Sequence, residues 1–136
     1  MLPHRNAVWM GIAATILVLN GLSSSSVRPV NPGRAKRVSA KIQINTFEGC
    51  LGQYKIDTGF YPTSAQGLSA LRSDPGLKGW NGPYVSQEIP LDPWGRLYLY
   101  RYPGEHSNEP DIVSFGADGK PGGSGEDEDV TSWKAN

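Results

Sequence analysis

The stretch RAKRVSAKIQINTFEGCLGQYKIDT, residues 34–58, decides the fold. Its apolar residues recur at spacings of 4, 3, 4 and 3, which places them on one face of an α-helix. Gly59 and then Pro62 end the helical pattern. We therefore predict one long amphipathic helix, with an apolar face that consists of Ala40, Ile44, Phe47, Leu51 and Tyr54.

The chain after this helix carries one further helical signal and three strand signals. Residues 63–71 place apolar side chains at helical spacing behind an N-cap candidate and predict a short second helix. Residues 73–93 are rich in turn-forming residues and predict a long packed loop. Strand formers gather at residues 96–102, 111–115 and 130–133. Because neither the helix nor a small antiparallel sheet can bury its apolar face alone, the predicted fold class is α+β.

The composition of the 136-residue chain excludes several classes of protein. The length permits one modest domain with a short appendage, and 17 glycines with 11 prolines exclude a long all-helical bundle. The single cysteine, Cys50, excludes an intrachain disulfide, and two histidines are too few for a Cys/His zinc site. The 13 basic residues are balanced by 13 acidic ones, so we expect no nucleic-acid partner.

The balanced net charge hides a gradient along the chain. Residues 1–47 contain six Lys and Arg residues and no acidic residue. Residues 105–129 contain eight acidic residues and only Lys120 in opposition. We expect these two oppositely charged ends to face different environments or partners.

Residues 1–26 have the pattern of a segment that directs export. A basic start precedes an apolar run at residues 7–19, shorter than the about 20 residues that span a membrane. The segment fits a secretory signal cleaved after Ser23 or an uncleaved membrane anchor, with a buried core helix as a third interpretation. Either of the first two places the rest of the chain outside the cytoplasm. We expect residues 27–33, with two prolines, to form a linker and residues 34–136 to form the globular domain.

The acidic end of the chain has the composition of a cation-binding loop. Residues 115–129 hold five carboxylates and five glycines. Calcium takes about six to eight oxygen ligands from carboxylates, backbone carbonyls and water, and a glycine-rich loop can bend its carbonyls around the ion. Asp118 would supply one wall of the site, and Asp127 and Asp129 would supply another. The spacing differs from an EF-hand, and a solvated acidic turn explains the same composition.

Catalytic chemistry finds little support in the sequence. His106 lies in a polar loop near several carboxylates, but no Ser or Cys lies in a recognisable nucleophile turn. Cys50 lies among apolar helix residues and is interpreted as a packing residue. The alternating tyrosines of residues 98–102 fit a half-buried strand better than a stacking platform. We therefore predict no enzymatic activity, and a small hydrolase that uses the acidic loop is the least favoured alternative.

Several motifs, in a fixed order, resemble one protein family. They are KIQI at 41–44, YKIDTGFYPTSAQGLSAL at 54–71, WNGPY at 80–84, PLDPWG at 90–95 and DIVSFGADG at 111–119. Together with the acidic tail they resemble the major pseudopilin of type II secretion systems, over about residues 33–133. The resemblance implies a structural subunit with a long N-terminal helix packed on a three-stranded antiparallel sheet.

The resemblance also implies a calcium ion that locks the C-terminal loop and supports subunit assembly. Carried onto this sequence, the ligands are the side chains of Asp118, Asp127 and Asp129 and the backbone carbonyls of Phe115 and Val130. The implied partners are like pseudopilin subunits, other secretion-system components and, through an uncleaved N-terminal segment, the inner membrane. The globular domain would then lie in the periplasm. The alternative is a calcium-stabilised periplasmic binding module of the same fold that does not polymerise.

The N-terminus departs from the family pattern. Members of the family carry a Gly followed by Phe-Thr-Leu-(Leu/Ile)-Glu, and the chain is cut after the Gly. Here Gly11 is followed by Ile12, and Ile16 stands where the glutamate belongs. Pro29 and Pro32 also interrupt the helical stalk. Two interpretations follow: a divergent pseudopilin that is anchored or exported by another route, or a chain that does not begin at the native start.

Overall fold

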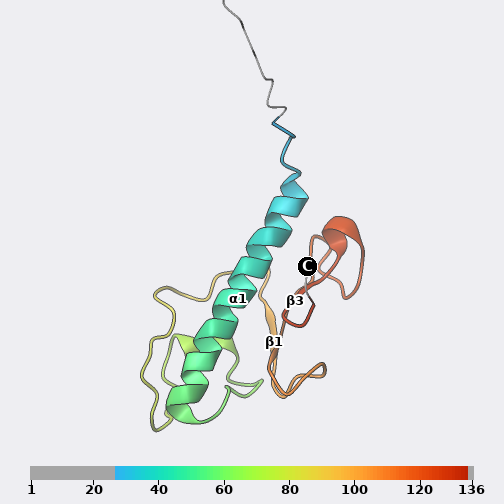
Figure 1. The fold of residues 1–136 in the computed structure, drawn as a ribbon. Helices are drawn as coiled ribbons and strands as arrows, with labels where there is room; N and C mark the ends of the chain where they lie inside the picture. Colours follow the sequence, from blue (N-terminus) through green and yellow to red (C-terminus); the bar gives the residue numbers. More distant parts are fainter. Residues whose placement is uncertain (1–26, 135–136) are drawn as a thin grey trace, which may run out of the picture.

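The computed structural model describes residues 27–134 and shows one long helix packed on a three-stranded antiparallel sheet (Figure 1). This arrangement confirms the predicted α+β fold class. The export or anchor segment predicted at residues 1–26 lies outside the described residues. In the part that is described, no helix is both long enough and apolar enough to span a membrane. The elements are α1 (Pro32–Thr58), η1 (Leu68–Leu71), β1 (Leu99–Arg101), β2 (Asp111–Ser114), η2 (Gly125–Asp127) and β3 (Val130–Thr131).

Helix α1 begins two residues earlier than predicted, at Pro32. Asn31 caps the helix, because its Oδ1 accepts hydrogen bonds from the backbone N–H of Gly33 at 2.9 Å and of Arg34 at 3.4 Å. Pro32 fits the first turn, where its missing N–H is not needed. At the other end Gly59 adopts a left-handed φ of 88°, which ends the helix as predicted.

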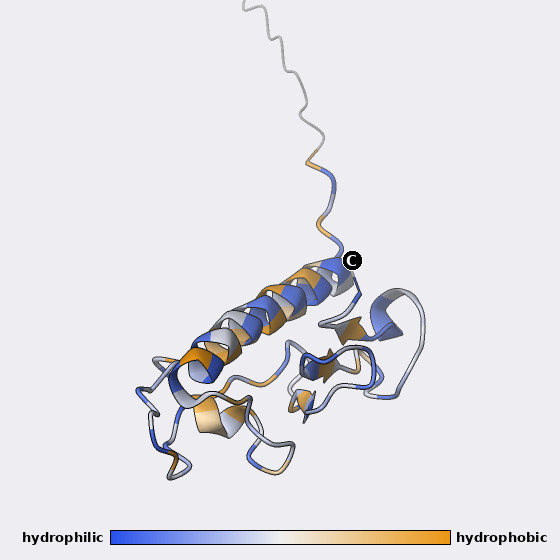
Figure 2. Ribbon diagram, turned by 60° about the horizontal axis from the view of Figure 1, so that its bottom comes forward, coloured by the Kyte–Doolittle hydropathy of each residue, from blue (hydrophilic) through white to orange (hydrophobic). Residues whose placement is uncertain are grey.

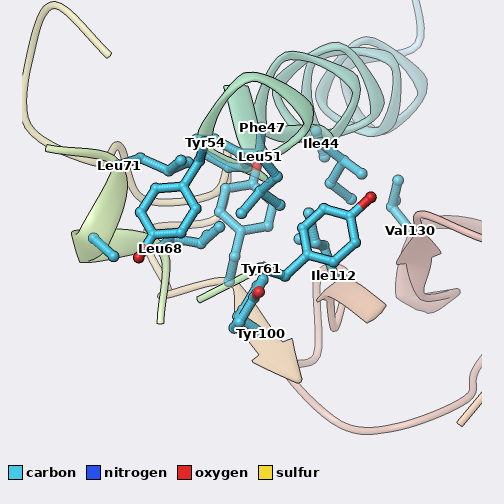
Figure 3. Close-up of a cluster of buried hydrophobic side chains, with 13 residues drawn as sticks. Ile44, Phe47, Leu51, Tyr54, Tyr61, Leu68, Leu71, Tyr100, Ile112 and Val130 are labelled. Atoms are coloured by element: carbon cyan, nitrogen blue, oxygen red, sulfur yellow. The ribbon is translucent and has the colours of Figure 1, made fainter. Parts of the chain in front are cut away.

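The predicted apolar face of α1 is confirmed and forms the centre of the core (Figure 3). Each of its five residues is at most 2% exposed, namely Ala40, Ile44, Phe47, Leu51 and Tyr54. Ile112 of β2 and Val130 of β3 meet this face from the sheet, and both are fully buried. Figure 2 shows hydrophobic residues on the strands beneath α1 as well as along the helix itself. Burying this face holds the helix, which carries two glycines in its interior.

The predicted alternation along residues 96–102 is confirmed, and its tyrosine face is the buried one. Tyr98 and Tyr100 are each 8% exposed, whereas Leu97 is 76% and Leu99 is 48% exposed. The rings of Phe47 and Tyr98 meet edge to face with centroids 5.3 Å apart. The two buried tyrosines therefore belong to the core and do not form a stacking platform on the surface.

The second predicted helix is reduced to the four-residue 3₁₀ helix η1. Thr63 and Gln66 do form a reciprocal cap: Thr63 Oγ1 accepts from the Gln66 N–H at 3.1 Å, and Gln66 Oε1 accepts from the Thr63 N–H at 2.9 Å. Gly67 then adopts φ 62° and ψ −166°, a conformation that interrupts the helix. Leu68 and Leu71 nevertheless reach the core, as their helical spacing suggested.

All three strands are shorter than their sequence signals. The register pairs Leu99 with Val113 and Arg101 with Asp111, and β3 adds only a two-residue ladder, with Val113 opposite Thr131. A strand requires a hydrogen-bonded neighbour as well as β propensity, so the unpaired ends of the predicted strands are not part of the sheet. The long loop between η1 and β1 packs on the core, as predicted, through the partly buried Trp80, Tyr84, Val85 and Ile89.

Candidate metal-binding loop

The candidate site is the acidic loop between β2 and β3, residues 115–129, which contains η2. Its backbone folds back tightly on itself, since Ala117 N–H donates to Glu126 O at 3.0 Å and Asp129 N–H donates to Gly122 O at 3.1 Å. Gly116 has a left-handed φ of 66°, and a Cβ at this position would lie 2.8 Å from Asp127 O. The close approach of two backbone segments therefore requires glycine at this position.

Asp129 is the predicted ligand with the most informative surroundings. Its Oδ2 accepts a hydrogen bond from the Gly122 N–H at 2.9 Å. Its Oδ1 is buried and has no hydrogen-bond partner. A buried carboxylate oxygen without a donor is costly, and a bound cation would satisfy it.

The other predicted ligands lie along the same loop. Asp118 is exposed, and its Oδ1 accepts a hydrogen bond from the Lys120 N–H at 3.0 Å. Asp127 is also exposed, whereas Phe115 is half-buried and Val130 is fully buried. Within residues 27–134, no three His, Cys, Asp or Glu side chains lie close enough together to hold a metal ion. The side-chain and carbonyl oxygens of the loop are nevertheless the donors that calcium prefers, and carbonyls and water often complete such a site.

Two basic side chains of α1 hold the C-terminal segment. Arg37 donates through Nη1 to the carbonyl oxygen of Glu128 and through Nη2 to its Oε2 at 3.2 Å. Lys41 Nζ donates to Thr131 O at 2.7 Å and to Lys134 O at 2.9 Å. The expectation that the two charged ends face different environments is therefore wrong for these residues, because α1 and the loop lie side by side. The charge gradient was the sequence signal that could have revealed this pairing.

Arg96 holds the opposite end of the loop. Its Nη1 donates to Gly116 O at 2.9 Å and its Nη2 to Ala117 O at 3.1 Å. The preceding turn fixes its position through Asp92, which is 4% exposed. Asp92 Oδ1 accepts from the Arg96 N–H at 2.9 Å, and Asp92 Oδ2 accepts from Ser114 Oγ at 2.7 Å. The PLDPWG motif thus connects the turn to β2 and directs Arg96 onto the loop.

His106 and Cys50 occupy structural positions. His106 Nδ1 lies 2.8 Å from Asp111 Oδ2, and its ring stacks on Trp133 with centroids 3.7 Å apart. These contacts fasten the turn before β2 to the segment after β3. Cys50 Sγ donates to Tyr84 O at 3.2 Å, and burial raises the pKa of this thiol. Both observations agree with the interpretation of Cys50 as a packing residue.

The long helix on a small antiparallel sheet, followed by a tight acidic loop, defines a pseudopilin-like subunit. The structure is similar to the crystal structure of the major pseudopilin from the type 2 secretion system of enterohaemorrhagic Escherichia coli. The TM-score is 0.61 at 35% sequence identity, over 74% of this chain and 88% of that chain. This likeness supports the fold that the helix and strand patterns predicted.

Sequence similarity over most of the chain identifies the family. The family described as type II secretion system (T2SS), protein G, matches residues 30–133, and the chain belongs to this family. It is 38% identical to the type II secretion system core protein G of Pseudomonas aeruginosa, over 93% of this chain and 86% of that protein. It is 35% identical to the protein of the same name from Vibrio cholerae, over 93% and 83%. The chain is therefore a structural secretion-system subunit of the pseudopilin type and not an enzyme.

Proposed function

We propose that this subunit assembles with like pseudopilin subunits to support protein export, and that calcium stabilises its C-terminal loop. Family membership over residues 30–133 supports the first part. The buried Oδ1 of Asp129, which has no donor, carries the second part. The other secretion-system components are the further partners of the subunit.

Within the loop, we assign the ion to the side chains of Asp118, Asp127 and Asp129 and to the carbonyls of Phe115 and Val130. Bound calcium supplies the positive charge that offsets repulsion among these carboxylates. The residues of the chain do the rest: the glycines permit the tight turns, and the basic side chains of α1 and Arg96 hold both ends of the loop. The ordered loop then presents a defined surface to neighbouring subunits.

We place the globular domain in the periplasm, with residues 1–26 as the connection to the inner membrane. A soluble periplasmic form would result if this segment is removed as a signal. In that case the same fold would act as a calcium-stabilised binding module that does not polymerise. The two alternatives predict different distributions of the protein in the cell.

Calcium binding is tested by thermal unfolding of the full chain with calcium and with the chelator EGTA. At a calcium concentration of about 100 times Kd, bound ion contributes about 2.7 kcal/mol, which corresponds to a Tm decrease on the order of 10 °C upon chelation. Asp129→Asn and Asp118→Ala should lower Tm in calcium and reduce the response to EGTA. Glu88→Gln, which removes an exposed carboxylate far along the chain from the loop, is the matched control. An unchanged wild-type Tm in EGTA would show that calcium does not stabilise the protein and would refute this part of the proposal.

Assembly is tested by crosslinking in cells that contain the secretion system. A ladder of like subunits in the membrane fraction is the expected result. Recovery of the chain only as a monomer in the soluble periplasmic fraction would instead favour the binding module. This experiment does not depend on the calcium measurement, so the two parts of the proposal can fail separately.

A further inference from the structure

Three residues of α1, spaced by four, contact the C-terminal segment in sequence order. Gly33, Arg37 and Lys41 share one face of the helix because four residues make about one turn. We call these three residues the clasp. Figure 1 shows the segment that they contact beside α1.

The clasp begins where the acidic loop meets the first turn of α1. Gly33 is buried, and a Cβ at this position would lie 2.1 Å from both Cδ and Oε1 of Glu126. The side chain of Glu126 therefore packs directly on the helix backbone. A carboxylate is favourable there, because the N-terminal end of a helix carries a partial positive charge.

Arg37, one turn further along α1, holds Glu128 more tightly. Its guanidinium binds both the backbone carbonyl and the carboxylate of Glu128. The Arg37 side chain is only 18% exposed, whereas the Glu128 side chain is 45% exposed. Two contacts to one residue from a largely buried guanidinium define the direction of the Glu128 side chain as well as its position.

The direction of Glu128 has a consequence for its neighbours. Glu128 has extended backbone angles, with φ −64° and ψ 136°. Successive side chains of an extended segment point to opposite sides. When Arg37 holds Glu128 toward α1, the following residue, Asp129, is directed away from the helix. Asp127 belongs to the 3₁₀ helix η2, so this alternation does not apply to it. Asp129 Oδ1 is the buried oxygen that lacks a donor.

We propose that Arg37 is a positioning residue for the cation loop: by holding Glu128 against α1, it directs the carboxylate of Asp129 to the ion. The inference rests on the proposed calcium site and adds a residue of α1 to it. Calcium binding in the loop is thereby linked to α1, the long helix of the subunit.

The sign of the effect separates positioning from simple electrostatics. Arg37 is a cation near a proposed cation site, so on charge alone its removal would strengthen calcium binding. Loss of positioning has the opposite effect, because Glu128 is released and the Asp129 carboxylate is no longer held in place. Arg37→Lys retains the positive charge but cannot bind the carbonyl and the carboxylate of Glu128 at the same time as a guanidinium does. Charge alone therefore predicts an unchanged calcium Kd for this variant.

The experiment measures the calcium Kd of the full chain by isothermal titration calorimetry, with circular dichroism to establish folding. Arg37→Gln should raise Kd about tenfold, and Arg37→Lys should raise it several-fold. Arg34→Gln removes the same charge from an exposed position on the same helix and should leave Kd unchanged or slightly lower. If Arg37→Gln fails to fold, the Kd of Arg37→Lys is used for the test instead.

A second comparison separates positioning from a merely structural tether. In a Glu128→Ala background there is no carboxylate to direct, so Arg37→Gln should change Kd much less than it does in the wild type. Equal changes in both backgrounds overturn the inference, as does an Arg37→Gln variant that binds calcium as tightly as the wild type. A wild type that binds no calcium refutes the proposed calcium site and the role of Arg37 together. A wild type that binds calcium with Kd unaffected by Arg37 refutes only the inference.

Discussion

Replacing Gly116 with alanine should destabilise the protein much more than the same replacement at Gly125. Both glycines lie in the acidic loop and have nearly the same left-handed φ, 66° and 61°. An L-residue in this conformation costs about 1–2 kcal/mol. At Gly116 the new Cβ would also lie 2.8 Å from Asp127 O and 2.9 Å from Glu128 O, whereas at Gly125 it would meet nothing within 4 Å.

The steric difference sets the expected magnitude. Overpacking against atoms that cannot move away costs about 1–3 kcal/mol, so Gly116→Ala should lose about 3 kcal/mol and Gly125→Ala about 1 kcal/mol. The difference corresponds to about 10 °C in Tm. Thermal unfolding followed by circular dichroism in EGTA measures it without a contribution from calcium. Equal losses for the two variants would show that backbone conformation alone, and not contact with residues 127–128, determines the effect.

Two further predictions concern Tyr61 and Cys50. Burial and the hydrogen bond to Glu109 raise the pKa of Tyr61 to about 12 from 10.0. The stabilisation that comes from this raised pKa is fully present below pH 10 and is lost as the pH rises from 10 through 12. The unfolding free energy therefore falls by up to about 1.4 kcal/mol per pH unit in this window. Tyr61→Phe should make denaturant midpoints fall less steeply over the same window, and an unchanged slope contradicts the assignment. Burial raises the pKa of Cys50, so iodoacetamide at pH 8 should alkylate the native thiol about tenfold more slowly than the unfolded one, and equal rates would contradict its buried environment.

The long helix could be predicted because its signal is local. The spacing of Ile44, Phe47 and Leu51 identifies both the helix and the side it buries, and Gly59 marks its end. The second helix was overestimated for the converse reason. Leu68 and Leu71 reach the core at the expected spacing, but the backbone angles of Gly67 are set by the chain around it.

The donor types of the candidate site could be predicted, but the surroundings of each donor could not. Composition identified residues 115–129 as the acidic loop. The burial of Asp129 Oδ1 depends on how the loop folds onto its own backbone, where the Gly122 N–H donates to the other oxygen of the same carboxylate. The same holds for Arg96, which the pattern placed in a strand and the structure directs onto Gly116. No local pattern contains information of this kind.

The charge gradient shows how a pattern can be correct while its interpretation is incomplete. Exposed ion pairs contribute little, because solvent screens them and ordering long side chains costs entropy. Arg37 differs, since its side chain is largely buried and donates to a carbonyl as well as to a carboxylate. Part of the basic half of the chain is therefore used within the molecule to hold the acidic end. Among the described residues of the basic half, Arg28, Arg34 and Lys36 remain exposed and are available to other partners, so the original expectation applies to these residues and not to the gradient as a whole.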